Sequence, residues 1–380
     1  MSFKKIGISP ELRVNLVQSG LKNAYPIQSE AIPSILKNRD IMGIAKTGSG
    51  KTLSYVLPIL MQTRTSKTVQ NRHIQFLVLV PTRELAVQVQ EVFHTYSKAY
   101  VDAPKSMAVF GGVSINPQMK NLSGTNILVA TPGRLIELIE SNALQLNKVQ
   151  TLVLDEADKM LNMGFREEMD QIFKLLPRQR QNLLFSATLN EEIERIQNFI
   201  LEDPKIIKIE DESEDFTSLI LQSAYAVEQD RKGLLLRHLI KDKEMKQVLV
   251  FCSSIYQADH VADKLRKNGF EARAIHSKKS QGARRTSLRM FKEGNLNILV
   301  ATDLLARGID IEFLPFVVNY ELPRSPKDYI HRIGRTGRAE NPGEAISFIS
   351  LKERPHFNVI QKKMGKWVKL IYSEEMDLNI

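Results

Sequence analysis

The sequence predicts an α/β protein with two tandem domains, each a mostly parallel sheet flanked by helices. Short apolar runs at 76–80, 127–131 and 298–302 alternate with amphipathic helical stretches such as 84–96 and 256–267. This alternation is typical of parallel sheets with helices on both faces. A chain of 380 residues also exceeds the size at which a single core stops growing, so two domains are expected.

One strand-like run is repeated, because Ile-Leu-Val-Ala-Thr occurs at both 127–131 and 298–302. Buried strands draw on few residue types, so chance could explain the match. Each copy is followed by a polar loop containing glycine and arginine, and we therefore favour two domains of similar design. The acidic run 210–215 is typical of a flexible linker, although a solvated helix start is the alternative. The predicted organisation is a first domain 1–209, a linker 210–217, a second domain 218–355 and a short basic extension 356–380.

The charge balance favours a polyanionic partner. The chain carries 53 basic and 43 acidic residues, giving a net charge of +10, although many basic proteins bind no polyanion. Its single cysteine, Cys252, excludes an internal disulfide and a multi-cysteine metal site. No apolar run approaches the roughly 18 residues of a membrane span, and the first residues lack a signal-peptide core. We expect a cytoplasmic protein without a membrane segment.

The segment 45–52, Ala-Lys-Thr-Gly-Ser-Gly-Lys-Thr, follows an apolar run at 41–44 and predicts a phosphate loop. It fits the pattern G-x-x-x-x-G-K-[ST] except that Ala45 replaces the first glycine. Glycines let backbone N–H groups turn onto phosphate oxygens, and the following helix offers its positive end. Lys51 is expected to reach the β- and γ-phosphates, and the Thr52 hydroxyl to ligate Mg²⁺. An ordinary Gly-Ser turn before a helix is the alternative.

The tetrapeptide Asp155-Glu156-Ala157-Asp158 ends another apolar run, 151–154. The carboxyl ends of strands in open α/β sheets are where ligands bind. Alone, such carboxylates are more often a helix cap or a solvated turn. Beside a phosphate loop they predict that Asp155 holds Mg²⁺ and Glu156 acts on water. Because polar motifs follow several strands, we expect the functional groups to gather along one edge of each sheet.

The segment 331–338, His-Arg-Ile-Gly-Arg-Thr-Gly-Arg, contains three arginines. Guanidinium groups suit bidentate contact with phosphate and stabilise transition-state charge. A basic surface loop or a nucleic-acid patch would also explain the segment. With a phosphate loop in the other domain, an arginine finger for the bound nucleotide is the interpretation we favour.

Together these motifs resemble the core of DEAD-box RNA helicases, superfamily 2 ATPases with two RecA-like lobes. The similarity extends over nearly the whole chain in the family's order. It includes the segments 20–28, 45–52, 81–86, 111–112, 131–134, 155–158, 186–188, 281–284, 302–310 and 331–338. The segments 111–119 and 279–284 are similar to the bacterial RhlE-type branch.

The resemblance implies ATP and Mg²⁺ as cofactors. An aromatic ring, Phe3, would stack on adenine while Gln28 hydrogen-bonds its edge, and a purely structural Phe3 is the alternative. The residues implied to bind ATP are Phe3, Gln28, Ala45, Lys46, Thr47, Gly48, Ser49, Gly50, Lys51, Thr52 and Asp310. Metal ligation is implied for Thr52 and Asp155, catalysis for Lys51, Glu156, Arg335 and Arg338, and coupling between the lobes for Asp158, Ser186, Thr188 and His331.

The resemblance also implies that both lobes contact RNA. The implied RNA-binding residues are Thr82, Arg83, Gly112, Thr131, Gly133, Arg134, Gln281, Arg284 and Thr302. Such backbone contacts confer affinity without sequence preference, and contacts to 2′-hydroxyls would favour RNA over DNA. Binding of this kind should weaken steeply with salt.

The expected activity is RNA-stimulated ATP hydrolysis that drives local, non-processive separation of short RNA duplexes and remodelling of RNA–protein complexes. An ATP-gated RNA clamp or assembly factor is an alternative that the same motifs would serve. A DNA translocase is disfavoured because the motifs match the RNA-acting family. We expect a monomer, with RNP, ribosome-assembly or RNA-decay proteins as candidate partners.

The segment 362–369 surrounds the only tryptophan with lysines. Stacking and charge would suit RNA binding there. A helix end packed on the second lobe is the alternative.

Overall fold

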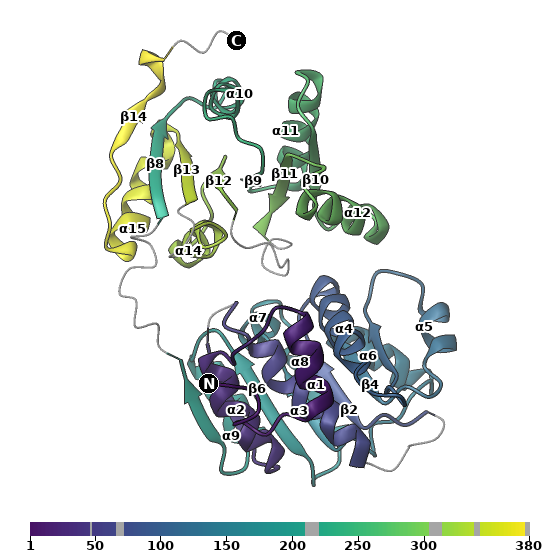
Figure 1. Cartoon of the computed structure of the whole chain (residues 1–380). Coiled ribbons are helices and arrows are strands. Elements are labelled where there is room, and N and C mark those ends of the chain that lie inside the picture. Colours follow the sequence, from purple (N-terminus) through teal and green to yellow (C-terminus); the bar gives the residue numbers. More distant parts are fainter. Residues whose placement is uncertain (46–47, 66–71, 210–219, 304–313, 338–342, 377–380) are drawn as a thin grey trace. The chain divides into compact units, whose positions relative to one another are not determined.

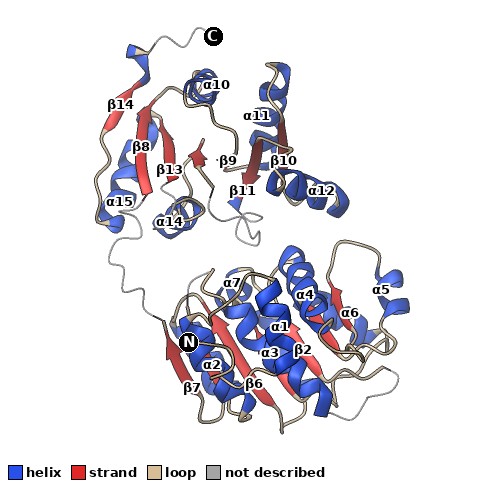
Figure 2. Cartoon of the chain, viewed as in Figure 1, coloured by secondary structure: helices blue, strands red, loops and turns tan. Residues whose placement is uncertain are grey.

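The computed structural model describes residues 1–45, 48–65, 72–209, 220–303, 314–337 and 343–376 (Figure 1). The chain divides into two compact units, Met1–Asp211 and Glu212–Ile380. The described residues of each unit form a parallel sheet of seven strands flanked by helices (Figure 2). The predicted fold class is confirmed, while the predicted linker 210–217 lies outside the described residues. None of the described helices is long and apolar enough to cross a membrane.

The sheet of the first unit has the strand order β3-β4-β2-β5-β6-β1-β7, and each neighbouring pair is parallel. Its strands therefore end at a common carboxyl edge, where the connections to the helices begin. The strands are β1 (Ile41–Ile44), β2 (Phe76–Leu79), β3 (Ser106–Val109), β4 (Ile127–Ala130), β5 (Thr151–Leu154), β6 (Gln181–Ser186) and β7 (Lys205–Lys208).

Helices cover both faces of this sheet and give it two apolar cores. One core gathers side chains from the first four helices, including Leu12, Tyr55 and Phe93. The other gathers side chains from the later helices, including Leu135 and Met160. The helices are α1 (Pro10–Gln18), α2 (Pro26–Leu36), α3 (Lys51–Thr65), α4 (Arg83–Ser97), α5 (Ile115–Asn121), α6 (Pro132–Glu140), α7 (Ala157–Asn162), α8 (Arg166–Leu175) and α9 (Glu191–Ile200).

The sheet of the second unit repeats this topology, with the order β10-β11-β9-β12-β13-β8-β14. When the strands of each unit are counted from its own first strand, the two orders are identical. The repeated apolar run forms β4 and β11, which occupy equivalent positions, so the interpretation of two similar domains is confirmed. The strands are β8 (Ile220–Ala226), β9 (Val248–Cys252), β10 (Ala272–Ile275), β11 (Ile298–Thr302), β12 (Phe316–Asn319), β13 (Gly343–Ile349) and β14 (Leu370–Tyr372).

The described residues of the predicted C-terminal extension 356–380 pack on the second unit. Phe357 and Ile360 lie in an apolar core with Tyr329 and Ile349, and β14 pairs with β8 at the edge of the sheet. The described helices of the unit are α10 (Lys232–Asp242), α11 (Ile255–Lys267), α12 (Gln281–Lys292), α14 (Pro326–Ile333) and α15 (Arg354–Met364), with 3₁₀ turns η1 (Leu351–Glu353) and η2 (Ser373–Glu375).

A buried ion pair fastens the start of α10 to the turn before α15. The Lys232 side chain is fully buried and its Nζ donates to Glu353 Oε2 at 2.9 Å. Glu353 also accepts from the backbone N–H and the hydroxyl of Ser350. Burial raises the pKa of Glu353, but Ser350 and Lys232 together outweigh burial and hold that pKa below its ordinary value.

The substitution Glu353→Gln should destabilise the second unit by about 3–5 kcal/mol, because it leaves the buried Lys232 ammonium without its counter-charge. Urea unfolding followed by far-ultraviolet circular dichroism measures this loss of stability. The control Glu11→Gln removes an exposed partner of Arg64 and should leave the midpoint unchanged. Since the pKa of Glu353 is lowered, the stabilisation is present at neutral pH and is lost as acid protonates the folded carboxylate. Equal midpoints for the two variants would contradict the assignment.

Candidate nucleotide and nucleic-acid sites

Three predicted motifs meet at the carboxyl edge of the first sheet. The phosphate loop leaves β1, the acidic tetrapeptide leaves β5, and the segment 186–188 leaves β6. These three strands are neighbours in the order β5-β6-β1. The backbone N–H of Ala45 donates to the Ser186 carbonyl at 3.1 Å, which joins the phosphate loop to the end of β6.

Two glycines give the phosphate loop its shape. Gly48 and Gly50 have φ values of 81° and 87°, which glycine adopts without the steric penalty of a Cβ. The loop leads directly into α3, whose first residue is Lys51. Lys46 and Thr47, also predicted to bind ATP, lie outside the described residues. The arrangement presents a glycine loop followed by a helix N-terminus, which suits a phosphate group.

Lys51 is a buried cation among carboxylates. Its Nζ donates to the Ala45 carbonyl at 2.5 Å. Burial lowers the pKa of Lys51, while the nearby charges of Asp155 and Glu156 oppose that effect. The fold thus brings Lys51, which is predicted to bind phosphate, next to two carboxylates. Asp155 is predicted to bind the metal, and Glu156 is predicted to act on water.

Asp155 has one carboxylate oxygen fixed and one available to a cation. Its Oδ2 accepts from the Tyr55 hydroxyl at 2.8 Å, and its buried Oδ1 makes no hydrogen bond among the described residues. Burial raises the pKa of Asp155, and the charge of Lys51 opposes this. The Thr52 side chain is hydrogen-bonded to the same Tyr55. A carboxylate and a hydroxyl close together are oxygen ligands that fit Mg²⁺.

Glu156 adopts a left-handed backbone conformation, with φ 54° and ψ 46°, immediately before α7. For a residue with a Cβ this costs roughly 1–2 kcal/mol, and such strain often occurs at functional sites. The Glu156 Oε1 accepts from Lys159 Nζ at 2.7 Å. Its Oε2 is buried without a hydrogen bond among the described residues. Glu156 therefore keeps one carboxylate oxygen for a further donor such as water.

The predicted coupling residues of the first unit are in contact. Asp158 Oδ2 accepts from the Thr188 hydroxyl at 3.0 Å, and the Ser186 hydroxyl donates to the Thr188 carbonyl at 2.7 Å. A change at the end of β6 would therefore reach α7 through one hydrogen bond. The fourth predicted coupling residue, His331, lies in α14 of the second unit.

The segment before α2 is tied to the phosphate loop by Gln28. Its fully buried amide accepts from the Tyr25 backbone N–H at 3.0 Å and donates to the Gly50 carbonyl at 3.1 Å. Phe3 is 4% exposed and packs in the apolar core. The proposed contacts of Phe3 and Gln28 with adenine stay predictions, and the structure adds a direct link between Gln28 and the phosphate loop.

The predicted RNA-binding residues of the first unit follow β2, β3 and β4, which are neighbours in the sheet. Thr82 caps α4 by accepting from the Leu85 N–H. Arg134 is buried, and its Nη2 donates to the Val113 carbonyl at 2.7 Å. Thr131 and Gly133 stand at the start of α6. The loop after β3 is thereby held against α6 at the same edge of the sheet.

Gly112 accepts a hydrogen bond from Arg83 and leaves room for its side chain. The Arg83 Nη1 donates to the Gly112 carbonyl at 3.4 Å, and a Cβ on Gly112 would lie 1.8 Å from Arg83 Nη2. The φ of Gly112 is 73°, a conformation that favours glycine.

The substitution Gly112→Ala should therefore displace the Arg83 guanidinium and weaken RNA binding about tenfold, the loss of one charge-assisted contact. ATP binding without RNA should be retained. Fluorescence anisotropy with labelled single-stranded RNA measures the first quantity and a nucleotide titration the second. Gly124→Ala, which also has positive φ but open space around its Cβ, is the matched control. Undiminished RNA affinity in Gly112→Ala would refute the role of this contact.

In the second unit the predicted RNA-binding residues lie on or shortly after adjacent strands, β10 and β11. Thr302 ends β11, and Gln281 begins α12 shortly after β10. Gln281 Oε1 accepts from Arg284 Nη2, which fixes the two side chains to one another. Asp310, predicted to bind the nucleotide, lies outside the described residues.

The arginine segment 331–338 begins in α14, where Arg332 contacts residues at the carboxyl ends of β11 and β12. Arg335 does not lie at that edge, which corrects for this residue the expectation that functional groups gather along one edge of each sheet. Leu314, just before β12, donates its N–H to the Arg335 carbonyl at 3.0 Å and forms a parallel bridge with Thr336. Arg335 therefore lies near the amino ends of β12 and β13, because α14 has carried the chain back across the sheet. Arg338 lies outside the described residues.

The guanidinium of Arg332, the first arginine of the segment, forms hydrogen bonds within the second unit. Its Nε and Nη2 donate to the two carboxylate oxygens of Asp303 at 2.5 and 2.7 Å. Its Nη1 donates to Asn319 and to the Glu321 carbonyl. These contacts fasten α14 to the carboxyl ends of β11 and β12.

Tyr55 and Lys159 were not predicted from the sequence. Both orient the acidic tetrapeptide, Tyr55 through Asp155 and Lys159 through Glu156. Tyr55 stands four residues after Lys51, one helical turn along α3, and this spacing is the signal that could have identified it.

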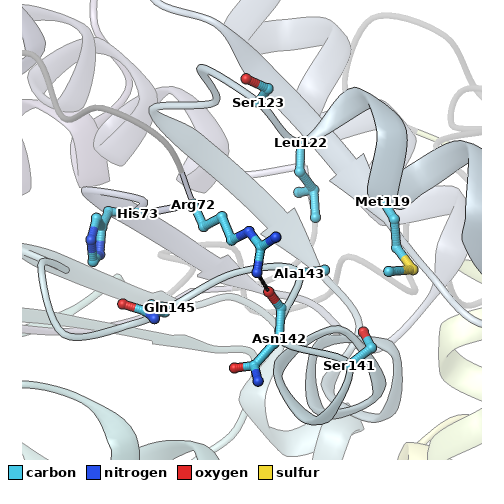
Figure 3. Close-up of a pocket in the computed structure, with 9 residues that line it drawn as sticks. All are labelled: Arg72, His73, Met119, Leu122, Ser123, Ser141, Asn142, Ala143 and Gln145. Carbon is cyan, nitrogen blue, oxygen red and sulfur yellow. Dashed lines mark hydrogen bonds between the residues drawn. The ribbon is translucent and has the colours of Figure 1, made fainter.

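The first unit also contains a cleft of about 550 Å³, and Figure 3 shows the residues that line it. Its lining includes Arg72 and His73, which precede β2, and Asn142 and Gln145, which follow α6. Arg72 Nη1 donates to the Asn142 carbonyl at 2.5 Å. These positions are at the amino ends of the strands, so the cleft is separate from the predicted nucleotide and RNA sites.

Comparison with known families agrees with the order of the motifs. Residues 25–196 match the DEAD/DEAH box helicase family, and residues 231–340 match the helicase conserved C-terminal domain. The chain is 40% identical over 370 residues to the DEAD-box ATP-dependent RNA helicase CshA of Streptococcus pneumoniae, covering 97% of this chain and 69% of that protein. It is 38% identical over 363 residues to CshA of Geobacillus kaustophilus, covering 95% and 76%. Similarity to the RhlE-type branch stays a prediction.

Solved structures show the same two-unit architecture. Dbp5 of S. cerevisiae bound to RNA and ADP BeF3 is 28% identical with a TM-score of 0.83, and the match covers 98% of this chain and 96% of that one. A DEAD box protein from the hyperthermophile Methanococcus jannaschii is 36% identical with a TM-score of 0.53, covering 98% and 99%.

Proposed function

The chain belongs to the DEAD-box family of ATP-dependent RNA helicases, and we propose that it hydrolyses ATP when single-stranded RNA is bound and thereby separates short RNA duplexes locally. The observation that carries this proposal is the cluster at the ends of β1, β5 and β6. There a buried lysine, two carboxylates with an available oxygen each, and a glycine loop lie together. This set of groups suits hydrolysis of a bound nucleoside triphosphate.

We assign the following roles to the residues of the nucleotide site. Lys51 neutralises phosphate charge, and the loop from Ala45 to Thr52 surrounds the phosphates. Asp155 and the Thr52 hydroxyl would hold Mg²⁺, which would offset the negative charge of the phosphates. Glu156 orients water and accepts its proton. Phe3, Gln28 and Asp310 bind the rest of the nucleotide.

The second unit completes hydrolysis in this proposal. Arg335 and Arg338 stabilise the charge that develops on the γ-phosphate, as arginine fingers do. Asp158, Ser186, Thr188 and His331 couple nucleotide binding to RNA binding. The Asp158–Thr188 hydrogen bond supports this role, because it connects the acidic tetrapeptide to the end of β6.

RNA is bound through its backbone in this proposal, with single strands and short duplexes as ligands and no sequence preference. The residues are Thr82, Arg83, Gly112, Thr131, Gly133, Arg134, Gln281, Arg284 and Thr302. By analogy with the family, we extend the proposal to a monomeric cytoplasmic enzyme that works with RNP, ribosome-assembly or RNA-decay proteins.

Strand separation of a short RNA duplex with a single-stranded overhang tests the proposal. We expect separation with ATP and none with a non-hydrolysable analogue. Repeating the assay at higher salt should weaken RNA binding, because phosphate contacts release counterions. Persistent RNA retention without separation would instead indicate the ATP-gated clamp.

A further inference from the structure

A basic aromatic strip lies at the C-terminal end of the second unit, outside the predicted nucleotide and RNA sites. We define it as Lys362, Lys363, Lys366, Trp367 and Lys369. The segment 362–372 that contains it has no acidic residue. Trp367 is 70% exposed, although burial of so large a ring would stabilise the fold.

The strip is held in place by the fold. Gly365 ends α15 in a left-handed conformation with φ 70°, and the Val368 N–H donates to Gln361 Oε1 at 2.7 Å. Val368 and Leu370 pack against the apolar core. Since successive side chains of an extended chain alternate in direction, Trp367 and Lys369 project outward, as their exposure shows.

An exposed aromatic ring among lysines has the composition of a single-strand binding site. Lysines attract the phosphates, while a ring stacks on any base because every base has a π-face. Tyr372, five residues further along the chain, is less suited to stack on a base, because the Arg354 guanidinium lies 5.3 Å from the centre of its ring.

The charge around the strip favours RNA over a protein partner. Phe199, on α9 of the first unit, provides the comparison because it is 68% exposed. The first turn of that helix carries Glu191, Glu192 and Glu194. The helix that carries Phe199 is net acidic, since only Arg195 opposes those three glutamates, and it would repel RNA. The lysines around Trp367 would attract RNA instead.

We infer that the basic aromatic strip is an accessory site for single-stranded RNA, in which Trp367 stacks on a base and the lysines contact flanking phosphates. The inference rests on the proposed RNA-dependent function and extends it. The nine predicted RNA contacts reach the backbone from the strand ends of both units. The strip adds a stacking contact on a different part of the second unit and increases affinity for strands long enough to occupy both sites.

The single tryptophan makes the site directly observable. Titrating the full chain with oligouridylate of about 40 nucleotides should quench Trp367 fluorescence, with a midpoint that shifts to higher RNA concentration as salt is raised. Trp367→Ala should raise the RNA concentration for half-maximal ATP turnover about tenfold while the maximal rate is retained. Trp367→Phe, which keeps a ring, should restore most of the affinity.

Two further variants separate stacking from general disturbance. Lys362→Glu with Lys363→Glu keeps the tryptophan but should shift its quenching to higher RNA concentration. Phe199→Ala, the control of matched exposure, should leave both readouts unchanged. An unquenched Trp367 together with RNA-stimulated turnover would overturn the inference and leave the proposed function standing, and would point to a protein partner for the strip. Loss of RNA-stimulated turnover in the wild type would instead refute the proposed function itself.

Discussion

Glu156→Gln is expected to bind ATP and RNA normally and to hydrolyse ATP about 10²–10⁴ times more slowly, the range typical of a lost general base. An amide cannot accept the proton of the attacking water. The substitution is nearly isosteric, so it should preserve the left-handed backbone before α7. The amide oxygen can still accept from Lys159, as the carboxylate does at 2.7 Å. Glu156→Gln should therefore remove only the ability of this side chain to accept a proton.

Single-turnover hydrolysis with RNA present, beside separate ATP and RNA titrations, measures this prediction. The control is Glu140→Gln, an exposed glutamate at the end of α6, which should behave as wild type. Because binding survives in Glu156→Gln, the variant should remain on RNA in the ATP-bound state. Wild-type turnover in Glu156→Gln would refute the assignment of the general base.

Lys51→Met is expected to weaken ATP binding by about 1.5–3 kcal/mol, roughly ten- to a hundredfold, because hydrogen bonds to a charged group are lost. The maximal rate should fall as well, since the lysine also stabilises charge in the transition state. A second effect follows from burial. The Lys51 charge lowers the pKa of Asp155 against the effect of burial, so its removal should raise that pKa further. Asp155 would then be protonated at a higher pH and hold a cation less well.

The pH dependence distinguishes these two effects. Nucleotide affinity of Lys51→Met should fall more steeply than that of the wild type as the solution is acidified, because protonation of Asp155 begins earlier. Lys37→Met removes an exposed lysine of the same unit and serves as the control. Unchanged nucleotide affinity in Lys51→Met would show that the loop from Ala45 to Thr52 is not the phosphate site.

Much of the fold was predictable because its signals are local. The apolar runs at 41–44, 76–80, 127–131, 151–154 and 298–302 form strands of the two sheets, and glycines marked the phosphate loop. The repeated run indicated two similar domains, and it occupies equivalent strands in the two sheets. The acidic tetrapeptide was placed beside the phosphate loop by the rule that parallel strands share a carboxyl edge.

Other features depend on contacts that sequence patterns do not record. The left-handed conformation of Glu156 could not be predicted, because no glycine stands at that position to indicate it. The spacing from Lys51 marks Tyr55 as a candidate, but only tertiary packing brings its hydroxyl to Asp155. The arginine segment begins in α14, which returns across the sheet, so Arg335 lies near the amino ends of β12 and β13. The lysines of the C-terminal segment dominate its sequence pattern. The apolar side chains between them place α15 and β14 in the second unit.

The rate of ATP turnover with and without single-stranded RNA tests the central claim most directly. At low salt, where phosphate contacts are strongest, saturating oligouridylate should raise the rate well above the RNA-free rate of the full chain. Glu156→Gln should show no such rise. Equal wild-type rates with and without RNA would contradict an enzyme whose ATP hydrolysis depends on RNA.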